Sequence, residues 1–581
     1  MPSATPSPAW DGRRSVIGTG AEATALLGWL TDPESPRLCL VTGAPGTGKT
    51  ALLDWLARYG PRAGRPRRRT VRALVPLAGQ SALGATWTIA DRLGVVARSP
   101  GDLVHALATG EARRTVLLLT DLHAAAEPEA ITRLIADLAG VGRVRLVVEA
   151  RDGTTAAAVL GAGHRVAVVA LDDADADDRP GGPGPERTEE SGPERTEESG
   201  PERTGTGSPG GPVPDLADPV AVCLADPLLV TTAYVTGSAA AGLPGTLDGP
   251  EPSARPGEDA AEDHGGLRVA WMRAGQSLCR EQTPSERALV LLSALGDGAD
   301  PRLRPALAEL AAGAPWRLRW ARHRGDLTPP WPGPVAVLGA AGGPLEGTLL
   351  VGDRTGVVRL LHEADASPAG RLAHTVPGRI TALAPAPDGT VLLLDDRGRL
   401  HTVRGAAQRA PYLERLTEAV SATLARHPGT ALAAIAGSVV VGDRLGSVHA
   451  FGLRGLHQAA SHSGRVTAVS AVDSATPFVC SGGADGTVRL WTPGRDPLPE
   501  PLAERSSPVV SLHAAETPYG PVVAAAWADG VVELHRPEGG PALAFRPGPP
   551  VRAVAVTGGG SLLVGTDESL VCLTPRNRTA S

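Results

Sequence analysis

The chain has 581 residues, of which 56 are basic and 62 acidic, so its net charge is −6. This length is too great for one hydrophobic core and predicts about three domains. The lack of a sustained basic face disfavours nucleic acid as the main partner. No apolar run reaches membrane-spanning length, and the five cysteines are far apart with no C-x-x-C pair. These features indicate a cytoplasmic protein with reduced thiols and disfavour a disulfide framework, a zinc site or a membrane partner.

The first motif along the chain is a glycine-rich loop between an apolar strand and a helix. The apolar residues before Gly43 predict a buried strand, and the residues after Thr50 have helical spacing. Between them the sequence GAPGTGKT fits G-x-x-x-x-G-K-[ST], the pattern of a phosphate-binding loop. Glycines let backbone N–H groups approach phosphate oxygens, and the N-terminus of the following helix favours an anion.

Each residue type in this loop has a chemical role. Lys49 would contact the β- and γ-phosphates, and the hydroxyl of Thr50 would bind Mg²⁺. Lys49 is the only lysine among the basic residues of the chain, and an arginine could not replace its compact ammonium group. The expected nucleotide-binding residues are Gly43, Gly46, Thr47, Gly48, Lys49 and Thr50. The alternative is a glycine-rich turn that binds no ligand.

Strand and helix patterns alternate as far as residue 171 and predict a parallel, doubly wound α/β sheet. Further strands are expected at 70–75, 115–121, 144–149 and 165–171, with helices at 83–93, from 102 and at 131–138. The strand at 115–121 is continuously apolar and ends in Asp121. We therefore expect Asp121 at the ligand edge of the sheet, as a second Mg²⁺ ligand. The alternative is an ordinary strand-end aspartate.

Several features together resemble the signal-transduction ATPases with numerous domains, the STAND branch of the AAA-like P-loop proteins. They are the entry segment Ile17-Gly18-x-x-x-Glu22 with its following helix, the phosphate loop, the strand ending at Asp121 and the strand ending near Arg151. The resemblance implies ATP or GTP with Mg²⁺ as ligands. It also makes Arg151 the sensor of the γ-phosphate, so that Lys49, Asp121 and Arg151 would form the catalytic set.

Two positions depart from the family's pattern. Thr19 stands where the entry motif has an arginine that lies near the adenine. Leu122 and His123 follow Asp121, where a second acid would polarise the attacking water. His123 and Glu149 are the candidate substitutes for that acid. We therefore expect nucleotide binding with slow hydrolysis.

Low-complexity stretches surround and interrupt a helical middle segment. Residues 172–214 contain the octapeptide GPERTEES twice and part of a third copy, with too few apolar residues to pack, and are expected to be disordered. Residues 215–312 are expected to be helical apart from a loose stretch at 237–265, and Thr283 to Glu286 form a capping box. The resemblance implies a lid and a winged-helix-like unit here, acting as a packing and relay element.

A repeated turn occupies the C-terminal half. The turns are centred on Gly356, Gly398, Gly446, Gly486, Gly530 and Ser569, which are 42, 48, 40, 44 and 39 residues apart. This period is typical of β-propeller blades, and SGGADGTVRLW in the fourth repeat resembles the WD repeat. We predict six blades, with seven as the alternative, and a closing strand that begins at Trp316. The turn aspartates are expected to brace their own hairpins.

The expected organisation is a loose N-terminus (1–12), a P-loop NTPase domain (13–171), a linker (172–214), a helical segment (215–312), a propeller (313–576) and a tail (577–581). Together these parts predict an ATP-binding regulatory switch whose nucleotide state controls recognition of a protein partner by the propeller. The resemblance implies nucleotide-dependent homo-oligomers. The alternative is a non-catalytic WD-repeat scaffold with a structural nucleotide site. A small-molecule kinase is disfavoured because no acceptor-site motif accompanies the loop.

Overall fold

The computed structural model describes residues 20–59, 71–109, 115–151, 154–171, 212–240, 263–324, 335–372, 378–386, 388–403, 411–435, 437–452, 455–474 and 476–576. The predicted loose N-terminus, residues 17–19 of the entry segment, nearly all of the 172–214 linker, most of the 237–265 stretch and the tail lie outside these residues. The chain divides into two compact units, 1–85 with 107–213, and 86–106 with 214–581. Each unit is described by itself.

The first unit contains a parallel sheet in the order β2-β3-β4-β1-β5. Its strands are β1 (Leu38–Gly43), β2 (Val71–Pro76), β3 (Thr115–Thr120), β4 (Val144–Glu149) and β5 (Val166–Leu171). The prediction of a parallel α/β sheet is confirmed. Every residue of β1 and β3 is buried, as their continuous apolar sequences require when helices cover both faces.

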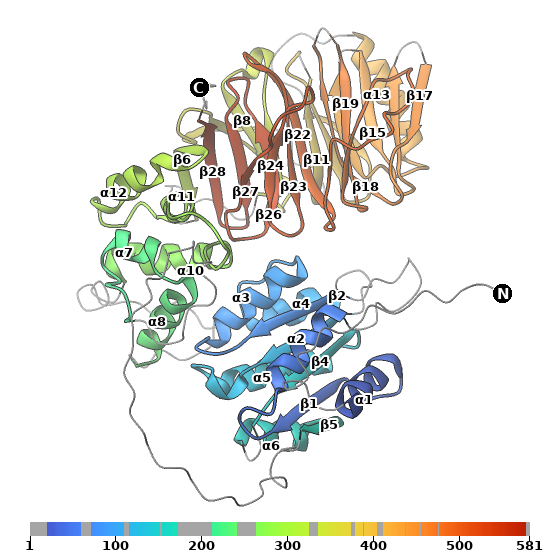
Figure 1. Cartoon of the computed structure of the whole chain (residues 1–581). Helices are drawn as coiled ribbons and strands as arrows, with labels where there is room; N and C mark the ends of the chain where they lie inside the picture. Colours follow the sequence, from blue (N-terminus) through green and yellow to red (C-terminus); the bar gives the residue numbers. More distant parts are fainter. Residues whose placement is uncertain are drawn as a thin grey trace, which may run out of the picture. The chain divides into compact units, whose positions relative to one another are not determined.

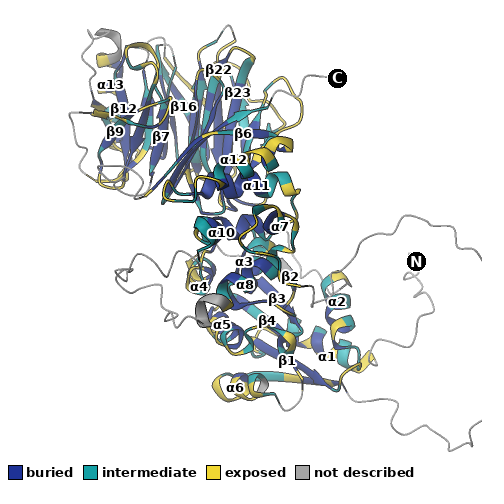
Figure 2. Cartoon of the chain, turned by 90° about the vertical axis from the view of Figure 1, so that its left-hand side faces the viewer, coloured by how far each residue is buried: buried dark blue, intermediate teal, exposed yellow. Residues whose placement is uncertain are grey.

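Helices lie on both faces of this sheet (Figure 2). α1 (Gly20–Thr31) and α2 (Lys49–Tyr59) pack Leu26, Trp29 and Leu53 against Cys39 and Val41 of β1. On the opposite face lie α5 (Pro128–Gly140) and α6 (Thr155–Gly163), of which α6 had not been predicted. The one-turn helix η1 (Leu122–Ala124) follows β3.

The second unit begins with part of the sequence between β2 and β3. α3 (Ala82–Leu93) and α4 (Pro100–Thr109) lie in that interval, and residues 86–106 belong to the second unit. The middle segment adds α7 (Pro219–Leu224), α8 (Pro227–Ala240), η2 (His264–Gly266), α10 (Leu267–Leu278), α11 (Pro284–Ala294), α12 (Leu303–Leu310) and η3 (Ala311–Gly313). The first part of the expected helical segment contains two helices, because Pro227 starts a new one. The capping box of Thr283 and Glu286 is present at the start of α11.

Six antiparallel sheets follow in the described part of the chain and form a six-bladed β-propeller (Figure 1). Blade 1 contains β7 (Val337–Ala340), β8 (Thr348–Gly352), β9 (Val358–His362) and β10 (Pro368–Arg371), with η4 (Gly343–Leu345) between β7 and β8. Blade 2 contains β11 (Ile380–Pro385), β12 (Val391–Asp395) and β13 (Leu400–Val403). Blade 3 contains β14 (Ala431–Ile435), β15 (Ser438–Gly442), β16 (Ser447–Gly452) and β17 (Gly455–Ala460).

The remaining blades complete the ring. Blade 4 contains β18 (Val466–Val472), β19 (Phe478–Gly483), β20 (Thr487–Trp491) and β21 (Ala503–Glu504). Blade 5 contains β22 (Val509–Thr517), β23 (Gly520–Trp527), β24 (Val532–His535) and β25 (Leu543–Phe545). Blade 6 contains β26 (Val551–Val556), β27 (Leu562–Thr566), β28 (Ser569–Pro575) and β6 (Trp316–His323).

The strand at Trp316 closes the ring, as predicted. β6 pairs antiparallel with β28 and is the fourth strand of blade 6. The indole N–H of Trp316 donates to Ala544 O in blade 5 (2.8 Å), and that of Trp320 donates to Glu363 O in blade 1 (3.0 Å). Because β6 completes the sixth sheet, the seven-blade alternative is wrong.

One helix of the propeller had not been predicted. α13 (Pro411–Leu424) packs Leu416, Val420 and Leu424 into the core between blades 2 and 3. Among the described residues, no helix combines the length and apolarity needed to cross a bilayer.

Candidate functional site

The phosphate-loop motif lies between β1 and α2, as the sequence indicates. Gly43, Gly46 and Gly48 have positive φ angles of 143°, 89° and 86°, which other residues rarely adopt. A Cβ on Gly43 would lie 2.5 Å from Leu171 O of β5, so a side chain there would collide with backbone. The helix begins directly after the loop, with Leu52 N donating to Gly48 O (2.9 Å).

Lys49 folds back over the loop. Its side chain is nearly buried, with 4% of the residue exposed. Its Nζ donates to Gly43 O (2.9 Å) and Ala44 O (2.6 Å) and contacts Thr47 Oγ1 (3.4 Å). Thr47 in turn donates its hydroxyl to Ala44 O (3.0 Å). The only ammonium side chain of the protein is therefore held at the centre of the glycine-rich loop.

The strand order determines which carboxylate lies beside the loop. Since β4 lies between β1 and β3, its last residue, Glu149, is closer to the loop than Asp121 is along the sheet edge. Thr50 Oγ1 donates to Glu149 Oε2 (2.9 Å). Burial raises the pKa of Glu149, the bond from Thr50 opposes this, and the charge of Asp121 raises it further. Glu149 is 3% exposed. The sequence had offered it only as a substitute for a missing acid.

Asp121, His123 and Arg151 lie at the same edge. Asp121 has a left-handed backbone (φ 57°) directly after β3. Burial lowers the pKa of His123, and the positive charges of Arg151 and Lys49 lower it further while Asp121 opposes them. His123 Nδ1 is buried and has no hydrogen-bond partner among the described residues. Arg151 is exposed. Because β3 and β4 are parallel neighbours, the residues that follow their carboxyl ends lie at the same edge of the sheet as the loop.

The chemistry of this edge fits a magnesium nucleotide. A lysine and positive-φ glycines suit phosphate oxygens, and hydroxyl and carboxylate oxygens suit Mg²⁺. No cluster of three or more His, Cys, Asp or Glu side chains with metal-site geometry occurs in the described part of the chain. Mg²⁺ usually takes several of its ligands from phosphates and water.

The propeller turns are a second set of polar sites, and five of them carry a bracing aspartate. In blades 1–3 the aspartate lies three residues before the turn glycine and accepts from two turn N–H groups at 2.8–3.1 Å; these residues are Asp353, Asp395 and Asp443. In blades 4 and 5 it lies one residue before the glycine, where Asp485 accepts from Thr487 N (3.1 Å) and Asp529 from Val531 N (3.2 Å). The structural role predicted for the turn aspartates is thus visible in five blades.

Blade 4 adds a histidine to this arrangement. His462 has a fully buried side chain; its Nδ1 lies 3.1 Å from Asp485 Oδ1, and its Nε2 lies 2.9 Å from Ser481 Oγ. Asp485 also accepts from Ser463 N (3.0 Å). Burial would raise the pKa of Asp485, but the bonds from His462, Ser463 and Thr487 outweigh it and hold the pKa well below its usual range.

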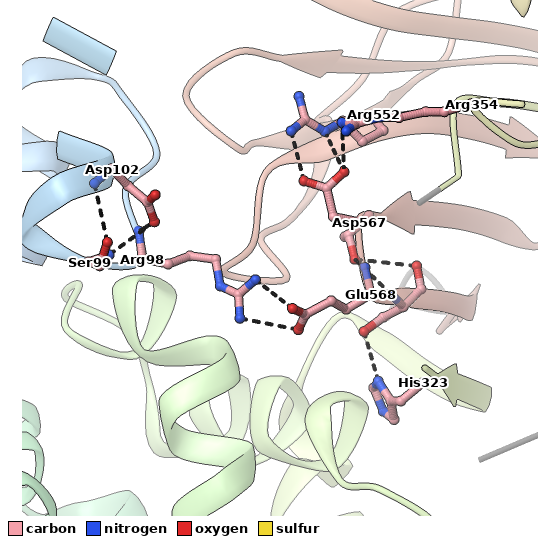
Figure 3. Close-up of polar contacts among 10 residues, drawn as sticks. Arg98, Ser99, Asp102, His323, Arg354, Arg552, Asp567 and Glu568 are labelled. Atoms are coloured by element: carbon pink, nitrogen blue, oxygen red, sulfur yellow. Dashed lines mark hydrogen bonds and ion pairs between the residues drawn. The ribbon is translucent and has the colours of Figure 1, made fainter. Parts of the chain in front are cut away.

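Blade 6 is built differently. Thr566 replaces the bracing aspartate, and its hydroxyl accepts from Glu568 N (3.3 Å) and Ser569 N (3.0 Å). Glu568 stands one residue before Ser569, where blades 4 and 5 have aspartate, yet its carboxylate pairs with Arg98 (Figure 3). Asp567 pairs with Arg552 and Arg354 from other strands and turns.

Comparisons with known proteins agree with this part of the fold. Residues 456–492, which span β17 to the start of the loop after β20, match the family "WD domain, G-beta repeat". The C-terminal region is therefore a WD40 β-propeller. Propellers of this family typically mediate protein binding. A search of curated protein sequences finds no match.

Two solved structures are among those to which the chain is similar. The WD40 β-propeller domain of Doa1 is 13% identical, with 46% of this chain and 98% of that chain covered, at a TM-score of 0.32. The computationally designed Ika8 protein is 18% identical, with 41% of this chain and 70% of that chain covered, at a TM-score of 0.27.

Proposed function

We propose that this protein is an ATP-binding regulatory switch of the STAND type, in which the nucleotide state controls recognition of a protein partner by the WD40 propeller. The observation that carries the proposal is the loop at 43–50, where Lys49 is buried over glycines of positive φ at the start of α2. In a protein without a ligand role, burying a lone ammonium group against carbonyl oxygens would be costly.

The residues divide the work of binding. Lys49 and the N–H groups of the loop would hold phosphate oxygens, and Thr50 with Asp121 would hold Mg²⁺, which neutralises phosphate charge. Glu149 accepts a hydrogen bond from the hydroxyl of Thr50 and so orients the oxygen lone pairs of that side chain. Arg151 would contact the γ-phosphate from the end of β4. Either ATP or GTP fits this chemistry, because each of these groups is assigned to phosphate or Mg²⁺ and none to the purine base.

Hydrolysis is expected to be slow. Leu122 occupies the place of a second acid, and Glu149 is already engaged with Thr50. His123 is the best-placed base, since its lowered pKa keeps the imidazole neutral and its Nδ1 accepts no hydrogen bond within the described chain. A His123→Ala variant should bind ATP as the wild type does while losing most of the residual turnover.

The second candidate function is a scaffold whose nucleotide site is structural. The WD40 match at 456–492 favours it, as does the hydrogen bond that occupies Glu149. Under this reading the propeller would bind the same partners whatever nucleotide is present.

Titration of ATP with Mg²⁺ by calorimetry distinguishes these readings, using Lys49→Ala and, as a control on an exposed part of α2, Arg58→Ala. Loss of a charge-assisted contact to phosphate should weaken binding about 10- to 100-fold in Lys49→Ala. Within the described residues Arg58 pairs with Asp54 on the surface of α2, so its variant should bind normally. Equal affinity in all three proteins would reject the nucleotide site. Tight binding with partner capture and oligomer size unchanged between ATP and ADP would favour the scaffold.

A further inference from the structure

The loop between α3 and α4, residues 94–99, contacts both the middle helices and the propeller. Its sequence lies between two strands of the α/β sheet, but residues 86–106 belong to the second compact unit. We call residues 94–99 the α3–α4 loop. Two groups of contacts set the place of this loop in the second unit, and a third group lies at the other end of α3.

The first group joins the loop to α10. Gln276, which is 6% exposed, accepts from Ala97 N through Oε1 (3.0 Å) and donates from Nε2 to Val95 O (2.8 Å). One amide side chain thus satisfies a donor and an acceptor of the loop backbone. Beside it, Trp87 of α3 packs on Gly275, where an added Cβ would lie 2.0 Å from the indole ring. The packing leaves no space for any other residue at position 275.

The second group joins the loop to the turns of blades 4 to 6. Ser507 Oγ, between blades 4 and 5, donates to Gly94 O (3.3 Å). A Cβ on Gly530, in the blade 5 turn, would lie 3.1 Å from Val96 Cγ2. Arg98 reaches Glu568 of the blade 6 turn through both guanidinium nitrogens, at 2.7 and 3.2 Å (Figure 3). Each of these propeller residues lies in or beside a hairpin turn.

The direction of Arg98 is fixed by the start of α4. Asp102 Oδ2 accepts from Arg98 N (3.1 Å) and Ser99 N (3.2 Å), and Ser99 Oγ accepts from Asp102 N (3.2 Å). This reciprocal cap is drawn in Figure 3 and ties the backbone of the loop to the helix that follows. The backbone from which Arg98 reaches Glu568 is therefore held in place by these hydrogen bonds.

The third group lies at the other end of α3, inside the first unit. The turn before α3 is bonded to the loop that carries Asp121 and His123: Leu77 N donates to Thr120 O (3.0 Å) and Gly79 N to Ala124 O (2.8 Å). Ala82 N, at the start of α3, donates to Glu127 Oε2 (2.8 Å). A movement of the 121–127 loop would thus displace the N-terminus of α3.

We propose that α3 and the α3–α4 loop form the relay that couples the candidate nucleotide site to the propeller, with the Arg98–Glu568 pair as its contact on blade 6. The proposal rests on the proposed function, because it needs a nucleotide whose state shifts the loop beside Asp121. In this relay, α3 moves as a rigid helix when the loop bonded to its N-terminus moves. The contacts of Gln276 and Trp87 hold the other end of the helix and the loop after it in place. The displacement then reaches Glu568, whose carboxylate is not the group that braces the blade 6 turn.

Hydrogen exchange of the full chain tests the relay with ATP and Mg²⁺ or ADP and Mg²⁺ as probes. In the wild type, replacing ADP by ATP should change protection in residues 43–50, in 94–99 and in 566–569. In Arg98→Glu the change should persist at 43–50 and vanish at 566–569, and the exchanged pair Arg98→Glu with Glu568→Arg should restore it. Glu568→Gln, which keeps the shape of the side chain, is the milder variant if charge reversal prevents folding.

Arg354→Ala is the matched control. Arg354 is 46% exposed and pairs with the neighbouring Asp567, but it comes from blade 1. This variant should respond to nucleotide as the wild type does, whereas Arg98→Glu should change the ratio of ATP to ADP affinity by about twofold to fivefold, the range of a partly exposed ion pair.

The two proposals fail in different ways. If nucleotide binds and protects residues 43–50 but 94–99 do not respond, or if 566–569 respond equally in Arg98→Glu, the relay is wrong and the nucleotide site stands. If neither nucleotide binds, the proposed function fails and the relay fails with it.

Discussion

The first five propeller turns and the sixth use different side chains to accept hydrogen bonds from the backbone N–H groups of the turn. In blades 1–5 an aspartate closes its own hairpin by accepting backbone N–H groups. In blade 6 the hydroxyl of Thr566 does this, and the two acids that follow it pair with arginines from elsewhere in the chain. A repeated turn needs an acceptor but not a charge, so a blade that uses threonine can direct its carboxylates to other segments.

The blade 6 turn, which lacks the bracing aspartate, is also the turn that contacts the α3–α4 loop. Blade 6 is the sheet that β6 completes, and its turn meets the α3–α4 loop through Arg98. The turns with a bracing aspartate need the carboxylate for their own stability, whereas the blade 6 acids can be changed with little effect on the hairpin. Substitutions in the two kinds of turn should therefore differ in the free energy of unfolding of the protein.

Asp529→Ala should have the largest effect. This carboxylate is 8% exposed, braces Val531 N and pairs with Arg505 (3.0 Å) and Arg546 (3.1 Å). Its removal leaves two partly buried arginines without their shared partner, which typically costs about 3–5 kcal/mol. The change in urea midpoint, followed by circular dichroism, measures it. Asp567→Ala is the matched control and should cost below about 1 kcal/mol, since its pairs with Arg552 and Arg354 are partly exposed. Equal losses of stability in the two variants would show that the bracing aspartate and the blade 6 acid do not differ in their contribution to the fold.

Asp485→Asn should have the next largest effect, and it depends on pH. Burial opposes ionisation of Asp485, but the bonds from His462, Ser463 and Thr487 lower its pKa below the ordinary value of 3.8. Because the folded pKa is the lower one, the carboxylate stabilises the fold above about pH 4, and this contribution is lost as the pH falls through the folded value.

The asparagine variant should lose about 2 kcal/mol at pH 7, since bonds to a charged acceptor are replaced by weaker ones. The difference between the two midpoints should begin to narrow below about pH 4 and should close only as the pH falls toward the folded pKa of Asp485. Urea midpoints measured from pH 7 to pH 3 test this expectation. A constant difference across that range would show that the charge of Asp485 contributes nothing.

Much of this architecture could be predicted from local sequence. Apolar runs such as 115–120 give buried parallel strands because both faces must be covered, and the spacing of the turn glycines gives the blades. The glycine and lysine pattern at 43–50 gives a strand, a loop and a helix because positive φ and helix initiation are local properties. The closing role of β6 could be deduced because the last repeat lacked a strand.

Long-range pairings could not be deduced in this way. The Thr50–Glu149 bond depends on β4 lying between β1 and β3, and a strand–helix alternation does not specify that order. The contact of Trp87 with Gly275 joins residues far apart in sequence, so no local pattern separates 86–106 from the α/β sheet. α13 had a readable signal, since Leu416, Val420 and Leu424 have helical spacing, but the surrounding β repeats obscured it.

Thr566→Ala should have the smallest effect of the three substitutions at bracing positions. Thr566 is fully buried, and its hydroxyl accepts from the N–H groups of Glu568 and Ser569 without carrying charge. Losing a neutral acceptor should cost about 1 kcal/mol, and Thr566→Ser, which keeps the hydroxyl, should recover most of it. Because no ionisable group changes, the loss should be the same at pH 7 and pH 3, unlike that of Asp485→Asn. A loss that matched Asp529→Ala, or one that serine did not recover, would mean that the blade 6 turn depends on packing of the threonine methyl group and not on its hydroxyl acceptor.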